Sequence, residues 1–212
     1  MNRVWGLTFV FSLVLFSCEN NPISEGQTAD DKVVLKGGEE SLSYNFKDEV
    51  EFSKVCLEEL REGNLEVFHQ FAEKKILLSP YAYIDQANFR KVSIAEIETP
   101  NDDIHFWGIY DGRGDSILMT TPEYLNRYIL NFPINSDGVE INVYEDKPKA
   151  YGSELHNMHE IYPNATFVEF YHPPSEEGYM DWNALIFVVE IIKHDYGNEY
   201  LLKAIVHNQW TV

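Results

Sequence analysis

The sequence predicts an α+β domain in which N-terminal helices pack on one face of a curved antiparallel sheet. Two observations support this prediction. In the first third of the chain, apolar residues recur at helical spacing, whereas the last third contains long runs rich in Val, Ile, Phe and Tyr. Because the helices come first and the long strands last, we expect them to form separate layers.

The first helix is expected over residues 48–61, where Phe52, Val55, Cys56 and Leu60 share one face. Gly63 ends this helix, and Asn64 can cap a second one that runs to about residue 72. Short buried strands are then expected at residues 76–78, stopped by a proline, and at 106–110, followed by a Gly-rich turn at 111–114.

A strong helix start follows in the middle of the chain. Thr121 supplies a hydroxyl cap, Pro122 suits the first helical position and Glu123 places acid in the first turn. Tyr124 and Tyr128 then lie one turn apart on the same face. The remaining expected elements are a strand at 139–144, a short helix at 153–160, strands at 166–171, 185–192 and 200–210, and a hairpin turn at 195–198.

Residues 1–17 have the parts of a secretory signal peptide, namely Arg3, an apolar run over 4–16 and a small residue before Cys18. This run is shorter than the roughly 20 residues that span a bilayer. It resembles the lipobox of bacterial lipoproteins, with Phe16 where a smaller residue is usual. We therefore predict cleavage before Cys18 and acylation of that cysteine by chains such as palmitate. The alternatives are a signal peptide with an incidental cysteine, or an N-terminal anchor.

The mature chain is expected to begin with a flexible tether over residues 18–45, rich in Gly, Ser, Asn and acids, followed by one domain over 46–212. The formal charge of −19 argues against nucleic acid as a partner and against electrostatic attraction to anionic lipid. The membrane contact should therefore be the lipid anchor. Cys56 has no partner once Cys18 is acylated, and on an apolar helical face it is expected to be a small core residue.

Several strings in this chain resemble a domain of bacterial exported proteins and lipoproteins whose function is not established. They cover about residues 65–212. The strings are SPYAY from Ser79, WGIYDGRG from Trp107, TPEY from Thr121, YPNA from Tyr162, MDW from Met180 and HNQWTV from His207. In that family the last string more often reads His-Asp-Glu-Trp, so Asn208 and Gln209 replace two acids here. The resemblance implies a location at the cell envelope and a fold, but it does not indicate which activity the domain has. The order of elements also resembles the cone-shaped NTF2-like and cystatin-like folds.

Aromatic side chains with polar tips are the first candidates for a ligand pocket, because such rings suit a small molecule or a glycan. The competing interpretation is that they form core. The predicted ligand-binding set is Tyr81, Tyr83, Trp107, Tyr110, Tyr124, Trp182 and Trp210.

Two weaker candidate sites involve ionisable groups. If Asp111, Asp181 and His207 met in an NTF2-like cavity, a carboxylate could orient the imidazole for hydrolase or isomerase chemistry. His156 and His159, with Glu154 or Glu160, could share a helical face and bind a metal, although a surface helix explains them as well. The chain has no G-x-S-x-G, P-loop or G-x-G-x-x-G signature, and no cofactor is expected.

Three functions follow from these patterns. The favoured one is a non-enzymatic module at the cell envelope that binds a small molecule, a glycan or an envelope protein. The alternatives are the small hydrolase or isomerase, and a structural envelope protein without a pocket. A structure separates them, since each requires a different arrangement of the same residues.

Overall fold

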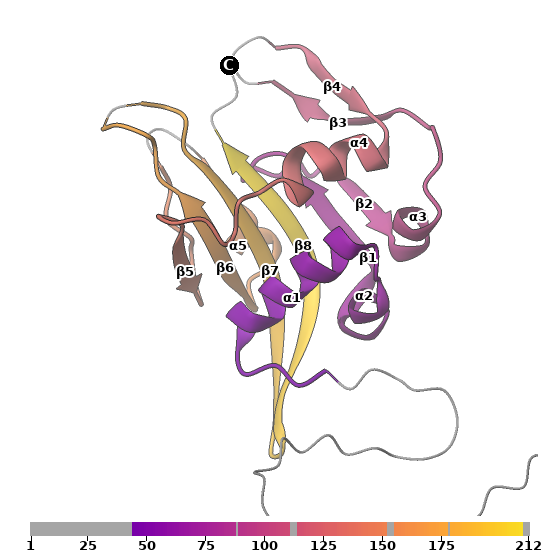
Figure 1. Ribbon diagram of the computed structural model, residues 1–212, viewed down its shortest axis with the longest axis vertical. Helices are drawn as coiled ribbons and strands as arrows, with labels where there is room; N and C mark the ends of the chain where they lie inside the picture. Colours follow the sequence, from indigo (N-terminus) through magenta and orange to yellow (C-terminus); the bar gives the residue numbers. More distant parts are fainter. Residues whose placement is uncertain (1–43, 88, 111–113, 152–154, 178, 210–212) are drawn as a thin grey trace, which may run out of the picture. The chain divides into compact units, whose positions relative to one another are not determined.

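A six-stranded sheet with strand order β2-β1-β8-β7-β6-β5 forms the centre of the structure, which is a computed structural model (Figure 1). The model describes residues 44–87, 89–110, 114–151, 155–177 and 179–209. The strands of this sheet are β1 Ala72–Ser79, β2 Arg90–Ser93, β5 Glu140–Tyr144, β6 Ala165–His172, β7 Asn183–His194 and β8 Gly197–Gln209. Cys18 and the cleavage site, most of the tether, Asp111, Glu154 and Trp210 lie outside the described residues.

The chain is α+β, but its sheet is mixed rather than antiparallel as predicted. Strand β1 pairs with β8 in parallel, with Leu78 opposite Ile205, and all other neighbours in this sheet pair antiparallel. The composition of a strand does not specify the direction of its neighbour, and β1 and β8 come from opposite ends of the domain. The parallel pairing has one important effect: the C-terminal ends of β1 and β8 lie side by side.

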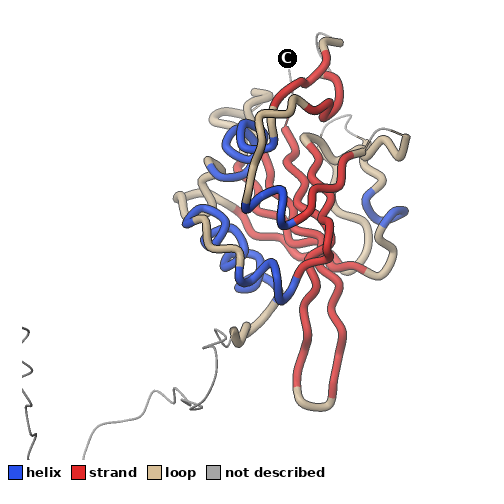
Figure 2. The backbone as a smooth tube through the Cα atoms, turned by 90° about the vertical axis from the view of Figure 1, so that its right-hand side faces the viewer, coloured by secondary structure: helices blue, strands red, loops and turns tan. Residues whose placement is uncertain are grey.

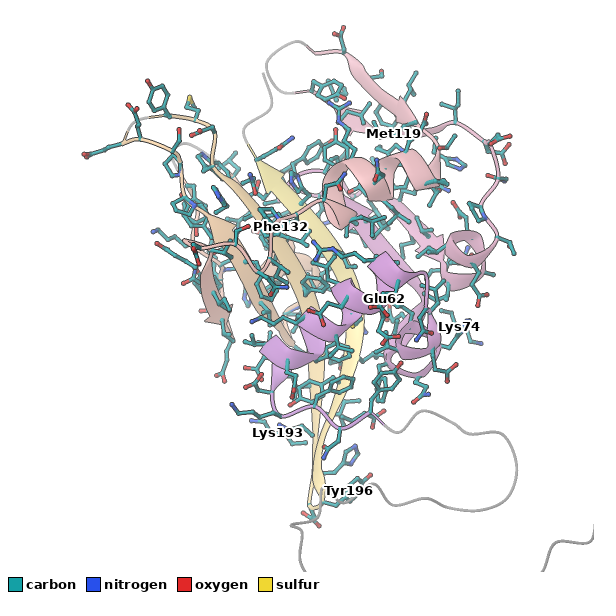
Figure 3. All side chains as sticks on the ribbon, viewed as in Figure 1. Glu62, Lys74, Met119, Phe132, Lys193 and Tyr196 are labelled. Carbon is teal, nitrogen blue, oxygen red and sulfur yellow. The ribbon has the colours of Figure 1, made fainter. Side chains whose placement is uncertain are left out.

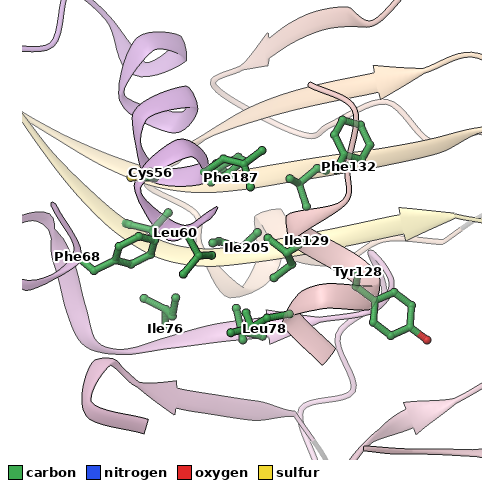
Figure 4. Packing of buried hydrophobic residues seen from close by; sticks show 14 of the residues in the cluster. Cys56, Leu60, Phe68, Ile76, Leu78, Tyr128, Ile129, Phe132, Phe187 and Ile205 are labelled. Carbon is green, nitrogen blue, oxygen red and sulfur yellow. The ribbon is translucent and has the colours of Figure 1, made fainter. Parts of the chain in front are cut away.

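Most of the helices lie on one side of the sheet (Figure 2). They are α1 Glu49–Glu62, α2 Glu66–Phe71, α3 Ile94–Glu98, α4 Thr121–Leu125 and the π-helical turn η1 Asn126–Leu130. Cys56 and Leu60 of α1 contribute to one buried cluster with Phe187 and Ile205 of the sheet (Figure 4). Cys56 is fully buried, and burial raises the pKa of its thiol, so the side chain acts as a small core residue.

Two aromatic residues at the expected start of the domain pack against α1. Tyr44 and Phe46 stack on each other with ring centroids 5.7 Å apart, and Phe46 meets Phe52 edge to face at 5.0 Å. The Tyr44 hydroxyl donates to Glu59 of α1. Residues 41–212 form one compact unit.

The second face of the sheet is also covered, which the sequence analysis did not anticipate. The short helix α5 Met158–Ile161 and the loop around Ile84 pack there, against Phe167, Ile186 and Val206 of the sheet. Asn157 fixes this cover to the loop, since its carboxamide accepts from Ile84 N at 2.8 Å and donates to Ile84 O at 2.9 Å. Burial on both faces explains why β6 to β8 read as nearly continuous apolar runs.

A separate two-stranded sheet forms from β3 His105–Ile109 and β4 Ser116–Met119. The strand β3 matches the predicted strand at 106–110, whereas the short elements β2, α3 and β4 were not predicted from the sequence. The helix start in this region was placed one residue late: Thr120 is the cap of α4, and its hydroxyl forms a capping box with Glu123. The predicted helix over 153–160 was also wrong in its bounds, because α5 begins only at Met158.

The hairpin of β7 and β8 projects beyond the rest of the sheet at the end near the start of α1 (Figures 1 and 2). His194 pairs with Gly197, so Asp195 and Tyr196 form the turn. Tyr196 lies at the tip and is 88% exposed (Figure 3). The hairpin turn predicted at residues 195–198 is therefore confirmed.

Candidate binding cleft

A cleft of about 550 Å³ lies where β1 and β8 end side by side. Its walls come from the segment after β1, from strand β3, and from residues near the starts of β2 and β7. The lining residues are Leu78, Ser79, Tyr81, Tyr83, Ile84, Asp85, Phe89, Arg90, Phe106, Trp107, Gly108, Ile109, Tyr110, Gly114, Leu155, Trp182, Asn208 and Gln209. Five of the aromatic residues proposed from the sequence are therefore brought together here: Tyr81, Tyr83, Trp107, Tyr110 and Trp182.

One close contact attaches the small sheet to the large one and so forms a wall of the cleft. The Tyr81 hydroxyl lies against Gly108 and accepts from Ile109 N at 3.4 Å. A Cβ on Gly108 would stand 1.9 Å from the Tyr81 hydroxyl oxygen, and Gly108 has φ +141°, a conformation that L side chains rarely adopt. The chain therefore needs glycine at this position, which is also where the β3–β4 register shifts.

The rings of Trp107 and Tyr124 are largely buried and support the floor of the cleft. Their rings stack with centroids 3.8 Å apart, and the Arg90 guanidinium lies over the indole at 5.2 Å. The indole N–H donates to the carbonyl of Met119, and Trp107 is only 4% exposed. Tyr124 is fully buried and is not among the residues that line the cleft, whereas Trp107 lines it with little of its surface exposed.

The rim of the cleft is apolar and exposed. Tyr83 is 52% exposed, and Phe89, Phe106, Ile109 and Leu155 are exposed as well. Exposed large apolar side chains gathered around one concavity are typical of interaction sites. Phe89 and Phe106 also line the cleft but were not predicted from the sequence. Phe106 lies next to Trp107 in β3, and this position was the available signal.

Several polar groups in the cleft already have partners within the protein. Ser79 Oγ donates to the carbonyl of Tyr81 at 2.6 Å, and Asp85 accepts from Ala87 N at 2.9 Å. Arg90 donates to the carboxylate of Glu96. That carboxylate also accepts from Thr121, and these hydrogen bonds lower its pKa against the opposing effect of burial. The positive charge of Arg90 is thus neutralised beside the cleft.

The side chains proposed for acid–base chemistry have separate environments. Both oxygens of Asp181 accept from Ser175, at 3.1 and 2.6 Å, and the side-chain hydrogen bond lowers the pKa of this exposed carboxyl. His207 is buried, its ring lies 5.4 Å from that of Tyr128, and burial lowers its pKa to about 4. His207 Nδ1 has no hydrogen-bond partner among the described residues. Among the described atoms, these two side chains therefore do not interact.

The two histidines proposed for a metal do not share a helical face, because His156 precedes α5. His159 Nε2 lies 3.3 Å from Asp146, and His156 is half-buried with its pKa lowered by burial and then by Lys147. Within the described ranges, no cluster of three or more His, Cys, Asp or Glu side chains has the arrangement of a metal site.

One buried polar network near the cleft was missed by the sequence analysis. Glu169 of β6 is fully buried, and its Oε2 accepts from Tyr151 at 2.8 Å and from Asn142 and Tyr144 at 3.2 Å. Burial raises the pKa of this carboxyl. The Tyr151 ring lies 5.2 Å from Trp182, which lines the cleft. Glu169 thus supports one wall of the cleft indirectly. A single acid within an apolar strand is the signal that could have revealed it.

Comparison with known proteins adds no relative: no family model, no curated protein and no solved structure matches this chain. Of the helices in the described part of the chain, none has the length and apolar character needed to cross a membrane.

Proposed function

We propose that this protein is a binding module of the bacterial cell envelope and that the cleft beyond β1 and β8 is its binding site. The cleft itself is the observation that carries the proposal. Its volume of about 550 Å³ falls within the roughly 300–1,000 Å³ typical of small-ligand pockets. Exposed apolar side chains surround its mouth, and a few polar groups lie deeper. We further propose the NTF2-like or cystatin-like cone as the fold type, supported by helices on one face of a sheet with long final strands.

Binding is favoured over catalysis by the chemistry of the lining residues. Asp181 and His207, the described members of the proposed catalytic set, have different partners, and neither lines the cleft. General acid–base catalysis requires groups within hydrogen-bond reach of one another and of the substrate. A structural role without a pocket is disfavoured by the cleft.

Tyr83→Ala tests the cleft as the binding site. A thermal-shift screen of apolar fragments and short glycans should yield a ligand that raises the Tm of the full chain, because binding to the native state stabilises it. Removing the exposed Tyr83 ring should weaken this ligand about tenfold, since one buried aromatic contact contributes about 1.5 kcal/mol.

Tyr196→Ala is the matched control, because it removes an exposed tyrosine at the far hairpin tip. It should leave the affinity unchanged. Equal losses in the two variants, or an unchanged affinity in Tyr83→Ala, would contradict the assignment of the cleft.

Membrane attachment is proposed to depend on acyl chains at Cys18. Cells fed a radiolabelled palmitate should label the wild-type protein, and Cys18→Ala should abolish the label and release the protein from the membrane fraction. The Tm of the domain should not change, because the sequence places Cys18 in the predicted tether rather than in the domain. Persistent labelling of the variant would show that another residue carries the lipid or that the chain is anchored differently.

A further inference from the structure

The side chain of Asn208 has no hydrogen-bond partner among the described residues, although the residue is almost completely buried. It lies near the C-terminal end of β8, lines the cleft, and is only 3% exposed. Among the residues that the structure describes, none accepts from or donates to its side chain, whereas buried polar side chains are usually paired. The cleft therefore contains a carboxamide that can both donate and accept and that is unpaired within the described part of the chain.

The same face of the sheet shows how such a group is satisfied. Asn157 binds both the N–H and the C=O of Ile84, at 2.8 and 2.9 Å. In extended backbone, these two groups of one residue point to the same side, so a single carboxamide matches them in the way that a neighbouring strand would. Ile84 itself lines the cleft. Asn208 offers the matching pair of atoms to a second extended segment from outside.

The chemistry of the other lining residues favours a peptide over a sugar as the ligand. A sugar carries many hydroxyl groups, each of which needs a partner, but Ser79, Asp85 and Arg90 already bond within the protein. The rim instead offers aliphatic and aromatic surface, including Ile109 and Leu155. Alternate side chains of an extended peptide can occupy such surface while its backbone is held from below.

We propose that the cleft binds an extended, apolar peptide segment and that the Asn208 carboxamide bonds to the N–H and C=O of one residue of that segment. This inference rests on the proposed function, because it names the ligand class of the same cleft. A neutral carboxamide can both donate and accept, which a bond to the N–H and C=O of one residue requires.

The test first selects peptides that bind the protein and then removes one backbone N–H from the selected peptide. A display library of short random peptides is selected on the full chain, and the enriched peptide is remade with an ester replacing each amide in turn. One ester position should weaken binding about tenfold in the wild type, since it deletes the N–H that Asn208 accepts. In Asn208→Ala, the same ester should cause no further loss of affinity, because the bond that it removes is already absent. Comparing the two losses completes a double-mutant cycle. Asn208→Leu, which keeps the side-chain volume, replaces Asn208→Ala if that variant fails to fold.

Each other outcome overturns the inference. If apolar fragments bind at the cleft but no peptide is enriched, the binding function stands and the peptide assignment fails. The same holds if an N-acetylated sugar oligomer binds there instead. If peptides bind but the ester weakens the affinity equally in the wild type and in Asn208→Ala, Asn208 does not bond to the peptide backbone. If neither fragments nor peptides bind, the proposed function fails as well.

Discussion

Gly108→Ala is expected to lower the free energy of unfolding by about 3 kcal/mol. Part of this loss, about 1–2 kcal/mol, comes from holding an alanine at φ +141°. The rest comes from the new methyl group, which would overlap the Tyr81 hydroxyl at 1.9 Å and push the β3–β4 sheet away from β1. Thermal unfolding should show a fall in Tm of about 6–12 °C for a domain of this size.

Two comparisons separate the overlap from the backbone strain. Gly138→Ala places a methyl group in open space at φ +88°, so it should cost only about 1 kcal/mol. Gly108→Ala made in a Tyr81→Ala background should also cost only the backbone strain. If Gly108→Ala is as mild as Gly138→Ala, the contact between Tyr81 and the small sheet does not exist in solution.

Acidification from pH 6.5 to pH 4 is expected to remove about 3 kcal/mol of stability through His207. Burial lowers the pKa of His207 from 6.5 to about 4, so the unfolded chain takes up a proton in this range while the folded chain resists it. Because the unfolded state binds more protons, stability falls as the pH falls. The contribution is complete above pH 6.5 and is lost progressively toward pH 4.

His207→Gln removes the titrating group, so its stability should depend less steeply on pH across this interval. Urea unfolding of both proteins at several pH values measures the difference. Glu169 acts in the opposite direction, since the raised pKa of its carboxyl favours the folded state at low pH, and it is present in both proteins. Identical pH slopes in wild type and variant would show that His207 is exposed to water or paired in the native state.

The sequence predicted the long elements well because their patterns are long. The face of Phe52, Cys56 and Leu60 identified α1, and apolar runs identified β6, β7 and β8. The short elements β2, α3 and β4 were not predicted, because four or five residues contain too little periodicity to distinguish a strand or helix from a loop. The parallel pairing of β1 with β8 was not predicted for another reason. It joins strands that are far apart in the sequence, and no local pattern encodes such a pairing.

The candidate site was predicted in part. Aromatic composition brought Tyr81, Tyr83 and Tyr110 into the proposed set, and all three line the cleft. Composition cannot tell a lining ring from a supporting one, which is why Tyr124 was included although it is buried beneath Trp107. Asn208 entered the sequence analysis only as a replacement for an acid, because its lack of a side-chain partner among the described residues is visible only in three dimensions.

Chemical-shift mapping of the backbone amides tests the central claim most directly. When the ligand found by screening is titrated into the isotope-labelled chain, we predict that the largest shifts occur at Tyr83, Phe106 and Asn208, around the cleft. Amides near Tyr196 at the projecting hairpin should not move. Shifts confined to the hairpin, or spread over the sheet without reaching Asn208, would contradict the cleft as the binding site.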